Sequence, residues 1–181
     1  WNIDPIELDK RISKKTKAII PVHLHGRPCD MDKIGGLAKK YGLKVVEDAA
    51  HATEAWYKGK KIGSISDFTA FSFYATKNLA TGEGGMLTTN KKRWAEEARI
   101  KSLHGISKDA WKRYSSTGFT PYEAVYAGYK YNMPDIIAAL GLSQLKRLEA
   151  NLQIRRKYWK MMNAGLKDVE GITLPPDEQP G

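Results

Sequence analysis

Short apolar runs alternate with amphipathic segments along the first half of the chain. Residues 18–22 and 44–47 are apolar runs of strand length. Between them, residues 30–41 place their apolar positions on one helical face, with Asp30 suited to cap the helix and Gly42 suited to end it. Strand, loop, helix and strand in this order predict a βαβ unit with parallel strands and a right-handed crossover.

The pattern continues with further strands and helices. We expect a hairpin-like excursion over residues 56–67, strands over 68–73 and 85–90, and a short strand near 172–175. Helices are predicted over 91–104 with Asn90 as cap, after 132–135 with Asn132 as cap, and over roughly 152–166. The long irregular segment 105–131 has the length of a functional or mobile loop. Together these elements predict an α/β fold with a mostly parallel sheet.

Composition narrows the functional classes. The 181 residues and 41% hydrophobic content fit one globular domain of ordinary size. The single Cys29 leaves no internal disulfide framework and favours a reducing compartment, so we expect a cytoplasmic protein. No run of about 18 apolar residues occurs, so we expect no contact with a membrane core.

The net charge of +10 raises the alternative of a nucleic-acid-binding domain. The lysines and arginines form short clusters tens of residues apart, which is typical of solvated faces and not of a nucleic-acid patch. A basic surface of this kind would still attract an anionic small molecule. His23 and His25 have the spacing of a metal pair, but no third ligand joins them at a suitable spacing, so we expect no metal site.

Two strand ends carry the candidate chemistry. Asp48 ends one predicted strand, and Lys77 follows the Phe-rich strand that precedes a loop with three glycines. Ligands of open α/β sheets bind beyond the carboxyl ends of the strands. Pyridoxal phosphate (PLP) forms a Schiff base with a lysine amine and acts as an electron sink, and a carboxylate keeps its ring nitrogen protonated. Lys77 and Asp48 suit those two roles.

Two further residues fit the same cofactor. Purely structural roles also remain open for Asp48, Lys77 and His51. Ala50 is small enough for the ring to lie against the backbone, and Ser72 suits the phosphate. Taken alone, Asp48 is also typical of a helix cap or a turn, and Lys77 of a surface lysine. His51 alone is typical of a buried, hydrogen-bonded side chain.

Five segments of the chain together resemble the sugar aminotransferases of the DegT/DnrJ/StrS type, which share the type I aminotransferase fold. The segment 46–52 is similar to the family's pyridine-binding segment, and 71–78 with 83–85 is similar to its lysine segment. Residues 21–26, 103–107 and 128–135 match in the same order. The resemblance extends over essentially the whole chain.

The resemblance implies that Lys77 carries PLP as a Schiff base and shuttles the proton in transamination. It implies that Asp48 pairs with the pyridine nitrogen and that Ala50 lies under the ring. His51 stands where many members have Gln as the partner of the ring hydroxyl, and Ser72 stands at the phosphate-binding position.

A second subunit is also implied by the resemblance. Residues 128–135 resemble a segment that reaches the cofactor phosphate of a neighbouring subunit, which implies a homodimer with shared active sites. Many members have Asn and Arg where this chain has Lys130 and Asn132. The phosphate contact therefore stays open between Lys130 and Asn132, and Asn132 is included among the expected site residues.

The resemblance also implies the extent and the activity of the chain. Residues 1–149 correspond to the central part of the PLP-binding large domain, a partial three-layer α/β/α unit, and 150–181 to a linking helix and the start of the smaller C-terminal domain. Complete members begin before Trp1 and continue past Gly181, so we expect the isolated chain to bind cofactor weakly or not at all. The implied reaction is transfer of an amino group from an amino acid to a keto-sugar nucleotide, with L-glutamate as the usual donor.

The implied pathway is the biosynthesis of amino sugars for surface polysaccharide or secondary metabolites. Two alternatives share the fold. One is a regulatory or inactive homologue that binds PLP without transamination. The other is a sugar dehydratase, in which histidine replaces the lysine, so Lys77 argues against it.

Overall fold

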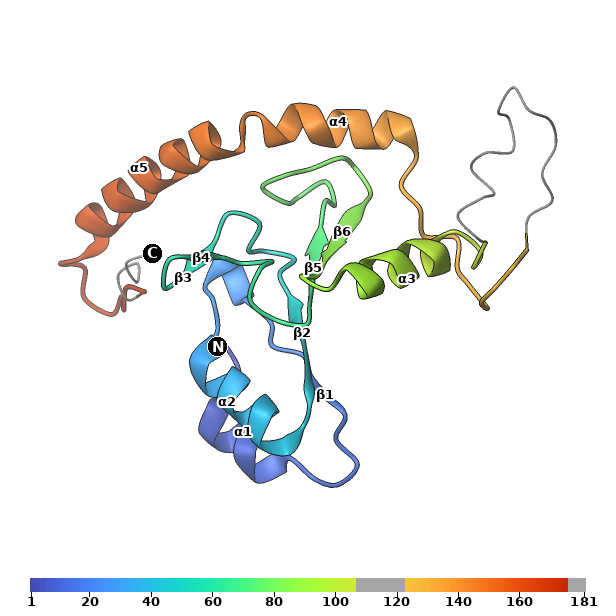
Figure 1. Ribbon diagram of the computed structural model, residues 1–181. Helices are drawn as coiled ribbons and strands as arrows, with labels where there is room; N and C mark the ends of the chain where they lie inside the picture. Colours follow the sequence, from blue (N-terminus) through green and yellow to red (C-terminus); the bar gives the residue numbers. More distant parts are fainter. Residues whose placement is uncertain (107–122, 176–181) are drawn as a thin grey trace.

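A four-stranded sheet forms the centre of the molecule (Figure 1). The computed structural model describes residues 1–106 and 123–175. The strand order is β1-β2-β5-β6, where β1 is Ala18–Ile19, β2 Lys44–Asp48, β5 Phe68–Ser72 and β6 Gly85–Thr88. The first three strands are mutually parallel and β6 runs antiparallel to β5. The predicted βαβ unit and mostly parallel sheet are confirmed.

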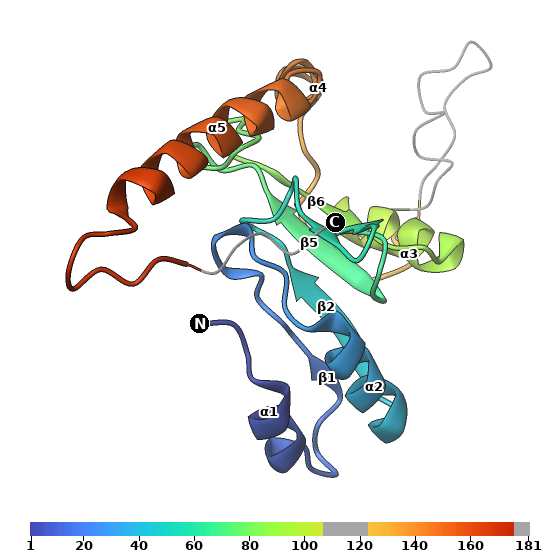
Figure 2. The ribbon, with the colours of Figure 1, turned by 90° about the vertical axis from the view of Figure 1, so that its left-hand side faces the viewer.

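Five α-helices surround this sheet in the described parts of the chain. They are α1 Pro5–Arg11, α2 Met31–Tyr41, α3 Lys92–Ser102, α4 Asp135–Leu145 and α5 Leu148–Leu166, and a 3₁₀ turn, η1, spans Leu24–Gly26. Between β2 and β5, the strands β3 (Trp56–Tyr57) and β4 (Lys60–Lys61) form the small hairpin predicted there. Helices α4 and α5 follow one another as a long arm across one end of the sheet (Figures 1 and 2).

Helix α2 shows why the sequence folds locally as expected. The Asp30 side chain accepts a hydrogen bond from the backbone N–H of Lys33 at 3.2 Å, which caps the helix start. Gly42 ends the helix in the left-handed conformation at φ 66°. The buried face of α2 packs into the main core, whose residues from the helix and the strands include Ile19, Met31, Ile34, Ala38 and Val45.

The two faces of the sheet are covered by different helices. Side chains alternate along a strand, so Val45 points to the face that α2 covers and Val46 points to the opposite one. Phe68, which pairs in register with Val46, stacks on Trp94 of α3 with ring centroids 5.0 Å apart. Helices α2 and α3 therefore cover opposite faces, as in the expected α/β/α arrangement.

The caps predicted for α3 and α4 are wrong. The Asn90 side chain donates to the carbonyl of Ser64 at 2.7 Å, and α3 begins after Lys91 without a side-chain cap. The Asn132 side chain accepts from the Lys130 amine, and α4 begins after Pro134, also without a side-chain cap. In both cases the polar side chain forms a hydrogen bond with another group in place of the helix N-terminus.

Other boundaries also differ from the predictions. The segment 172–175 is irregular and not a strand, and α5 begins at Leu148, four residues earlier than expected. Helix α1 was not predicted, although Asp4 accepts from the N–H of Ile6 and caps it. The middle of the predicted long loop, residues 107–122, lies outside the described residues.

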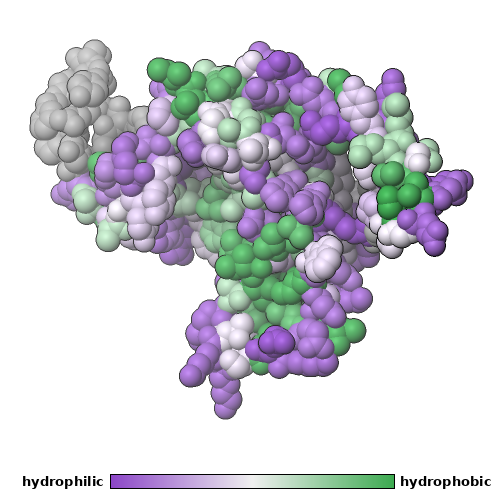
Figure 3. Space-filling model, turned by 180° about the vertical axis from the view of Figure 1, so that it is seen from behind, coloured by the Kyte–Doolittle hydropathy of each residue, from purple (hydrophilic) through white to green (hydrophobic). Residues whose placement is uncertain are grey.

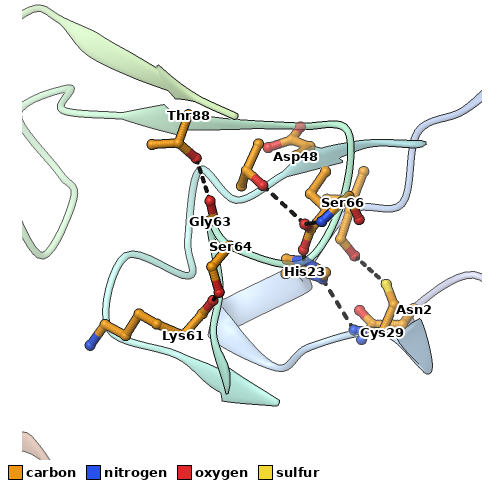
Figure 4. A network of polar contacts seen from close by, with 12 residues as sticks. Asn2, His23, Cys29, Asp48, Lys61, Gly63, Ser64, Ser66 and Thr88 are labelled. Atoms are coloured by element: carbon orange, nitrogen blue, oxygen red, sulfur yellow. Dashed lines mark hydrogen bonds and ion pairs between the residues drawn. The ribbon is translucent and has the colours of Figure 1, made fainter. Parts of the chain in front are cut away.

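A buried carboxylate holds the strands together next to the predicted site. The Glu47 side chain of β2 and the His23 side chain are both fully buried, and His23 Nε2 lies 2.7 Å from Glu47 Oε2. The Cys29 backbone N–H donates to His23 Nδ1 at 3.1 Å, as Figure 4 shows, so Nε2 carries the ring proton and donates to Glu47. The other carboxylate oxygen accepts from the Thr69 hydroxyl at 2.9 Å and the Ser66 N–H at 3.2 Å.

Several large hydrophobic side chains remain exposed. On α4, Ile136 is 84% exposed and Leu142 64%, and Ile20 next to β1 is 63% exposed. The view from behind shows hydrophobic surface over the lower middle of the molecule (Figure 3). Apolar surface of this extent is typical of regions that contact other chain segments or partners. None of the helices within residues 1–106 and 123–175 is both long and apolar enough to cross a membrane.

Replacing Glu47 by Gln is expected to lower the free energy of unfolding of the full-length protein by about 3 kcal/mol. In either orientation the Gln amide would place an N–H group against a donor, the His23 Nε2–H or the Ser66 N–H, and His23 cannot change tautomer while Nδ1 accepts from Cys29. Urea unfolding followed by far-UV circular dichroism measures the change. Glu7→Gln, which alters an exposed ion pair with Lys10, is the matched control and should leave the midpoint unchanged. An equal midpoint for wild type and Glu47→Gln would contradict the assigned network.

Acid should weaken the folded state through the same carboxylate. Burial alone raises the pKa of Glu47, but the hydrogen bonds from His23, Thr69 and Ser66 outweigh it, so the pKa lies below the usual value of 4.5. A carboxyl with a lowered folded-state pKa stabilises the protein above its unfolded pKa, and this contribution is lost as the pH falls through the folded value. The free energy of unfolding should therefore fall below about pH 4.5 more steeply in wild type than in Glu47→Gln. Urea titrations between pH 3 and pH 7 test this, and parallel pH profiles would contradict it.

Candidate active site

The carboxyl ends of three parallel strands meet at one edge of the sheet. Asp48 at the end of β2 pairs in register with Ala70 of β5, and a parallel bridge joins it to Val22 beyond β1. The Asp48 N–H donates to the carbonyl of Pro21 at 2.9 Å, and the Asp48 carbonyl accepts from the His23 N–H at 3.0 Å. The backbone of Asp48 is thus fixed by its neighbours at the edge where α/β sheets bind ligands.

The Asp48 side chain combines a turn role with an open acceptor. Its Oδ1 accepts from the N–H of Ala50 at 3.0 Å, which stabilises the turn after β2. Within residues 1–106 and 123–175, no hydrogen bond or ion pair reaches its Oδ2, and the side chain is partly exposed. Strand alternation and register place Asp48, Ala70 and Ser72 on the same face of the sheet. The turn interpretation and the site interpretation of Asp48 are therefore compatible.

A depression of about 230 Å³ opens beside this edge. It brings together three of the predicted site residues, Ala50, His51 and Lys77, from segments that follow different strands. Asp48, Ser72 and Asn132 are not among the described residues that line it. The complete lining is His25, Ala50, His51, Thr53, Thr76, Lys77 and Asn78.

Lys77 lies in a tight loop, residues 74–82, which we call the lysine loop. Its backbone N–H donates to the carbonyl of Tyr74 at 2.9 Å, and a bridge between Tyr74 and Gly82 closes the loop. Leu79 of the loop is buried against Phe73 and Leu148, which anchors the loop to the core.

The Lys77 amine is uncommitted. No hydrogen bond or ion pair to it exists among the residues that the structure describes, and the side chain is only partly exposed. Some surface lysines of this chain pair with a carboxylate, as Lys58 does with Asp32 and Lys10 with Glu7, and others do not, so its place inside the depression is what distinguishes Lys77. An unpaired amine inside a depression is the arrangement that a carbonyl cofactor needs.

His51 and His25 form a stacked pair at the rim of the depression. Their ring centroids lie 5.7 Å apart with the planes inclined by 11°. The His25 backbone N–H donates to His51 Nδ1 at 3.3 Å, so the neutral His51 ring carries its proton on Nε2 and can donate from there. His25 adopts the left-handed conformation at φ 53°, which is uncommon for a residue with a side chain and typical of constrained sites.

Gly26 allows this close approach of the two loops. It has φ 84°, and a Cβ atom on it would lie 2.9 Å from the carbonyl oxygen of His51. A larger residue would push the segments that carry His25 and His51 apart.

Ser72 and Asn132 lie in different surroundings. The Ser72 hydroxyl oxygen accepts from the Tyr74 N–H at 3.3 Å at the start of the lysine loop. Asn132 follows a segment that is held against the end of α3, where the N–H of Tyr131 donates to the carbonyl of Ser102 at 2.8 Å. The Lys130 amine donates to Asn132, so the two residues left open for the phosphate contact interact with each other.

Four lining residues were not predicted as site residues: His25, Thr53, Thr76 and Asn78. Thr76 and Asn78 flank Lys77, so their place beside the lysine was a usable signal. The sequence indicated His25 as half of a metal pair and as part of the matching segment 21–26, but not as a site residue. The structure instead separates the pair, with His23 buried on Glu47 and His25 exposed on His51. No cluster of three metal-ligating side chains occurs within the described ranges.

The residues at this edge fit pyridoxal phosphate. The free Lys77 amine suits its aldehyde, the open Asp48 oxygen suits a protonated ring nitrogen, and the His51 Nε2–H suits a ring oxygen. Ala50 is a small residue in the lining of the depression, which suits a flat ring. The aldehyde, the nitrogen and the oxygen of one ring would thus each find a matching group on this chain.

Comparison with known proteins agrees with this chemistry. The spore coat polysaccharide biosynthesis protein SpsC of Bacillus subtilis is 52% identical over 174 residues, which cover 96% of this chain and 45% of that protein. A solved structure of an assigned sugar aminotransferase of Streptococcus pneumoniae, in its PMP form, is 38% identical with a TM-score of 0.84, over 92% of this chain and 47% of that one. A PLP form of the same protein matches with a TM-score of 0.80.

The aminotransferase PseC of Helicobacter pylori, involved in the biosynthesis of pseudoaminic acid, is 32% identical with a TM-score of 0.85 over 93% of this chain and 43% of its own. The chain spans about half the length of the curated relatives it matches. The model of the DegT/DnrJ/EryC1/StrS aminotransferase family matches residues 1–180. The chain therefore belongs to this family of PLP-dependent aminotransferases and represents part of its type I aminotransferase fold.

Proposed function

We propose that the protein containing this chain transfers an amino group from an amino acid, with L-glutamate as the donor, to a nucleotide-linked keto-sugar. One observation carries the proposal: the unpaired Lys77 amine lies in a depression with Ala50 and His51, at the sheet edge where Asp48 ends β2. The family match over residues 1–180 gives this arrangement its reaction class.

Pyridoxal phosphate, when bound, supplies the carbonyl that reacts with amines and the electron sink that makes a substrate α-proton acidic. Lys77 is the residue that binds it covalently and afterwards moves the proton as general base and acid. Asp48 holds a proton on the ring nitrogen through Oδ2, while Oδ1 keeps the turn in place. His51 donates from Nε2 to the ring oxygen, and Ser72 donates its hydroxyl proton to the phosphate.

The sugar substrate is supported by the named roles of relatives in polysaccharide and pseudoaminic acid biosynthesis. We propose the same general setting, amino-sugar biosynthesis for surface polysaccharide or secondary metabolites, in the cytoplasm. The exposed hydrophobic residues of α4 support a homodimer in which residues 128–135 reach the partner's cofactor phosphate through Lys130 or Asn132.

Lys77→Ala should abolish covalent cofactor binding in the full-length protein. The wild type with added PLP is expected to show a visible absorption band that persists through dialysis and is bleached by borohydride, because only an amine in the site forms the bond. Mass spectrometry after borohydride should place the adduct on residue 77. Lys61→Ala, which removes another partly exposed lysine, is the control and should keep the band. A band that survives Lys77→Ala would contradict the assignment.

Asp48→Asn should separate cofactor chemistry from folding. The Asn oxygen can still accept from the Ala50 N–H, so the turn is retained, but the negative charge for the ring nitrogen is lost. We expect the rate of the half-reaction with L-glutamate to fall on the order of 100-fold while the unfolding midpoint stays close to wild type. Stopped-flow absorbance measures the rate. Asp30→Asn, the same change at the α2 cap far from the depression, should leave the rate unchanged.

The same half-reaction distinguishes transamination from a homologue that only binds the cofactor. A regulatory or inactive homologue would show the lysine-dependent band yet no spectral change with any amino acid. A wild-type protein that behaves in this way would contradict the proposed transamination.

A further inference from the structure

A second buried carboxylate, Glu54, lies behind the lysine loop and takes no part in the chemistry proposed above. Its side chain is 6% exposed although it follows β2 by only a short turn. Buried carboxylates need partners that replace water, because an unpaired buried charge is strongly destabilising. The partners of Glu54 therefore indicate what this residue does.

One partner belongs to the lysine loop. The Asn78 side-chain amide donates to Glu54 Oε2 at 2.8 Å. Asn78 is the direct neighbour of Lys77, and both side chains line the depression. A shift of the Asn78 backbone would therefore move the Cα atom from which the reactive amine extends.

The other partner belongs to the helical arm. The guanidinium of Arg155 on α5 donates to Glu54 Oε1. The two residues are 101 positions apart in the sequence. A further link joins the same elements at the surface, where the Lys61 amine binds both the Glu54 carbonyl at 3.3 Å and the Glu149 carboxylate of α5 at 3.2 Å. The two oxygens of one carboxylate thus connect α5 to the lysine loop.

We propose that Glu54 is a positioning residue that transmits the placement of α5, through Arg155 on one side and Asn78 on the other, to the backbone of Lys77. This inference rests on the proposed function, since it assigns the geometry of the same lysine. The apolar contacts of Leu79 with Phe73 and Leu148 hold the loop against the start of α5. The hydrogen bond between Asn78 and Glu54 holds the loop at a second point. Loss of either hydrogen bond leaves the loop backbone freer and the amine less well aimed.

The experiment compares Glu54→Gln, Arg155→Met and Arg155→Lys in the full-length protein. Lys157→Met is the matched control, because it replaces an exposed cation of the same helix for which no ion pair exists among the described residues. Two quantities are measured. They are deuterium exchange of the peptide containing residues 74–82 without cofactor, and the PLP concentration that half-saturates the lysine-dependent absorption band.

Glu54→Gln and Arg155→Met should each speed exchange of this peptide. Each should also raise the half-saturating PLP concentration by about tenfold, which corresponds to the loss of one charged hydrogen bond. Arg155→Lys, which keeps the charge, should fall between Arg155→Met and wild type, and Lys157→Met should match wild type. Asn78→Ala, at an exposed residue whose loss leaves Glu54 paired with Arg155, should reproduce the change in exchange.

Two outcomes would overturn the proposal. One is a lowered unfolding midpoint with unchanged exchange at 74–82, which would mean that Glu54 only stabilises the fold. The other is an Asn78→Ala variant that exchanges like wild type. If the wild-type protein shows no absorption band, the proposed function fails, while the exchange measurement without cofactor still decides whether Glu54 links α5 to the lysine loop.

Discussion

The carboxylate of Glu47 is buried in the sheet, and the positions of three strands depend on its hydrogen bonds. It accepts from His23 after β1, from Thr69 on β5 and from Ser66 before β5, so one side chain joins the three strands whose carboxyl ends form the site. Its neighbour Asp48 points to the opposite face because side chains alternate along a strand. Two adjacent acids therefore have different environments. Glu47 is satisfied by protein donors and fixes the backbone, whereas Asp48 keeps an oxygen available for a ligand.

Most elements near the site could be predicted from local sequence because short-range chemistry determines them. The capping side chain of Asp30 and the left-handed Gly42 bound α2 as expected, and the apolar runs on either side became parallel strands. The errors occurred where a local signal had a competing partner. Asn90 and Asn132 are good caps by residue type, but each binds a competing group, the distant Ser64 carbonyl in one case and the neighbouring Lys130 amine in the other. Helix α1 has only seven residues, too few for a periodic pattern to indicate it.

The site shows the same division between local and distant information. Lys77 and Ala50 are predicted from their positions after strands, and His51 from the family resemblance, and the structure gathers all three around one depression. The His25–His51 stack and the Glu54–Arg155 contact could not be predicted in this way, because they join residues far apart in the sequence. The separation is 26 positions for the stack and 101 for the contact. In the sequence Glu54 is an ordinary polar residue of a turn. Only the fold shows that it is buried and what it binds.

A reactive lysine has to satisfy two opposing requirements, and the lysine loop meets them with different atoms. The amine must stay free to react with a carbonyl, so it cannot be held by an ion pair. Its position must nevertheless be defined, because misplacement of a reacting group by about 1 Å can cost on the order of 100-fold in rate. The chain resolves this by fixing the loop backbone and leaving the lysine side chain unpaired. Leu79 is buried in the core, the Lys77 N–H donates to the Tyr74 carbonyl, and Asn78 donates to Glu54. Since Glu54 is shared with α5, the placement of the lysine depends on a helix that lies far along the chain.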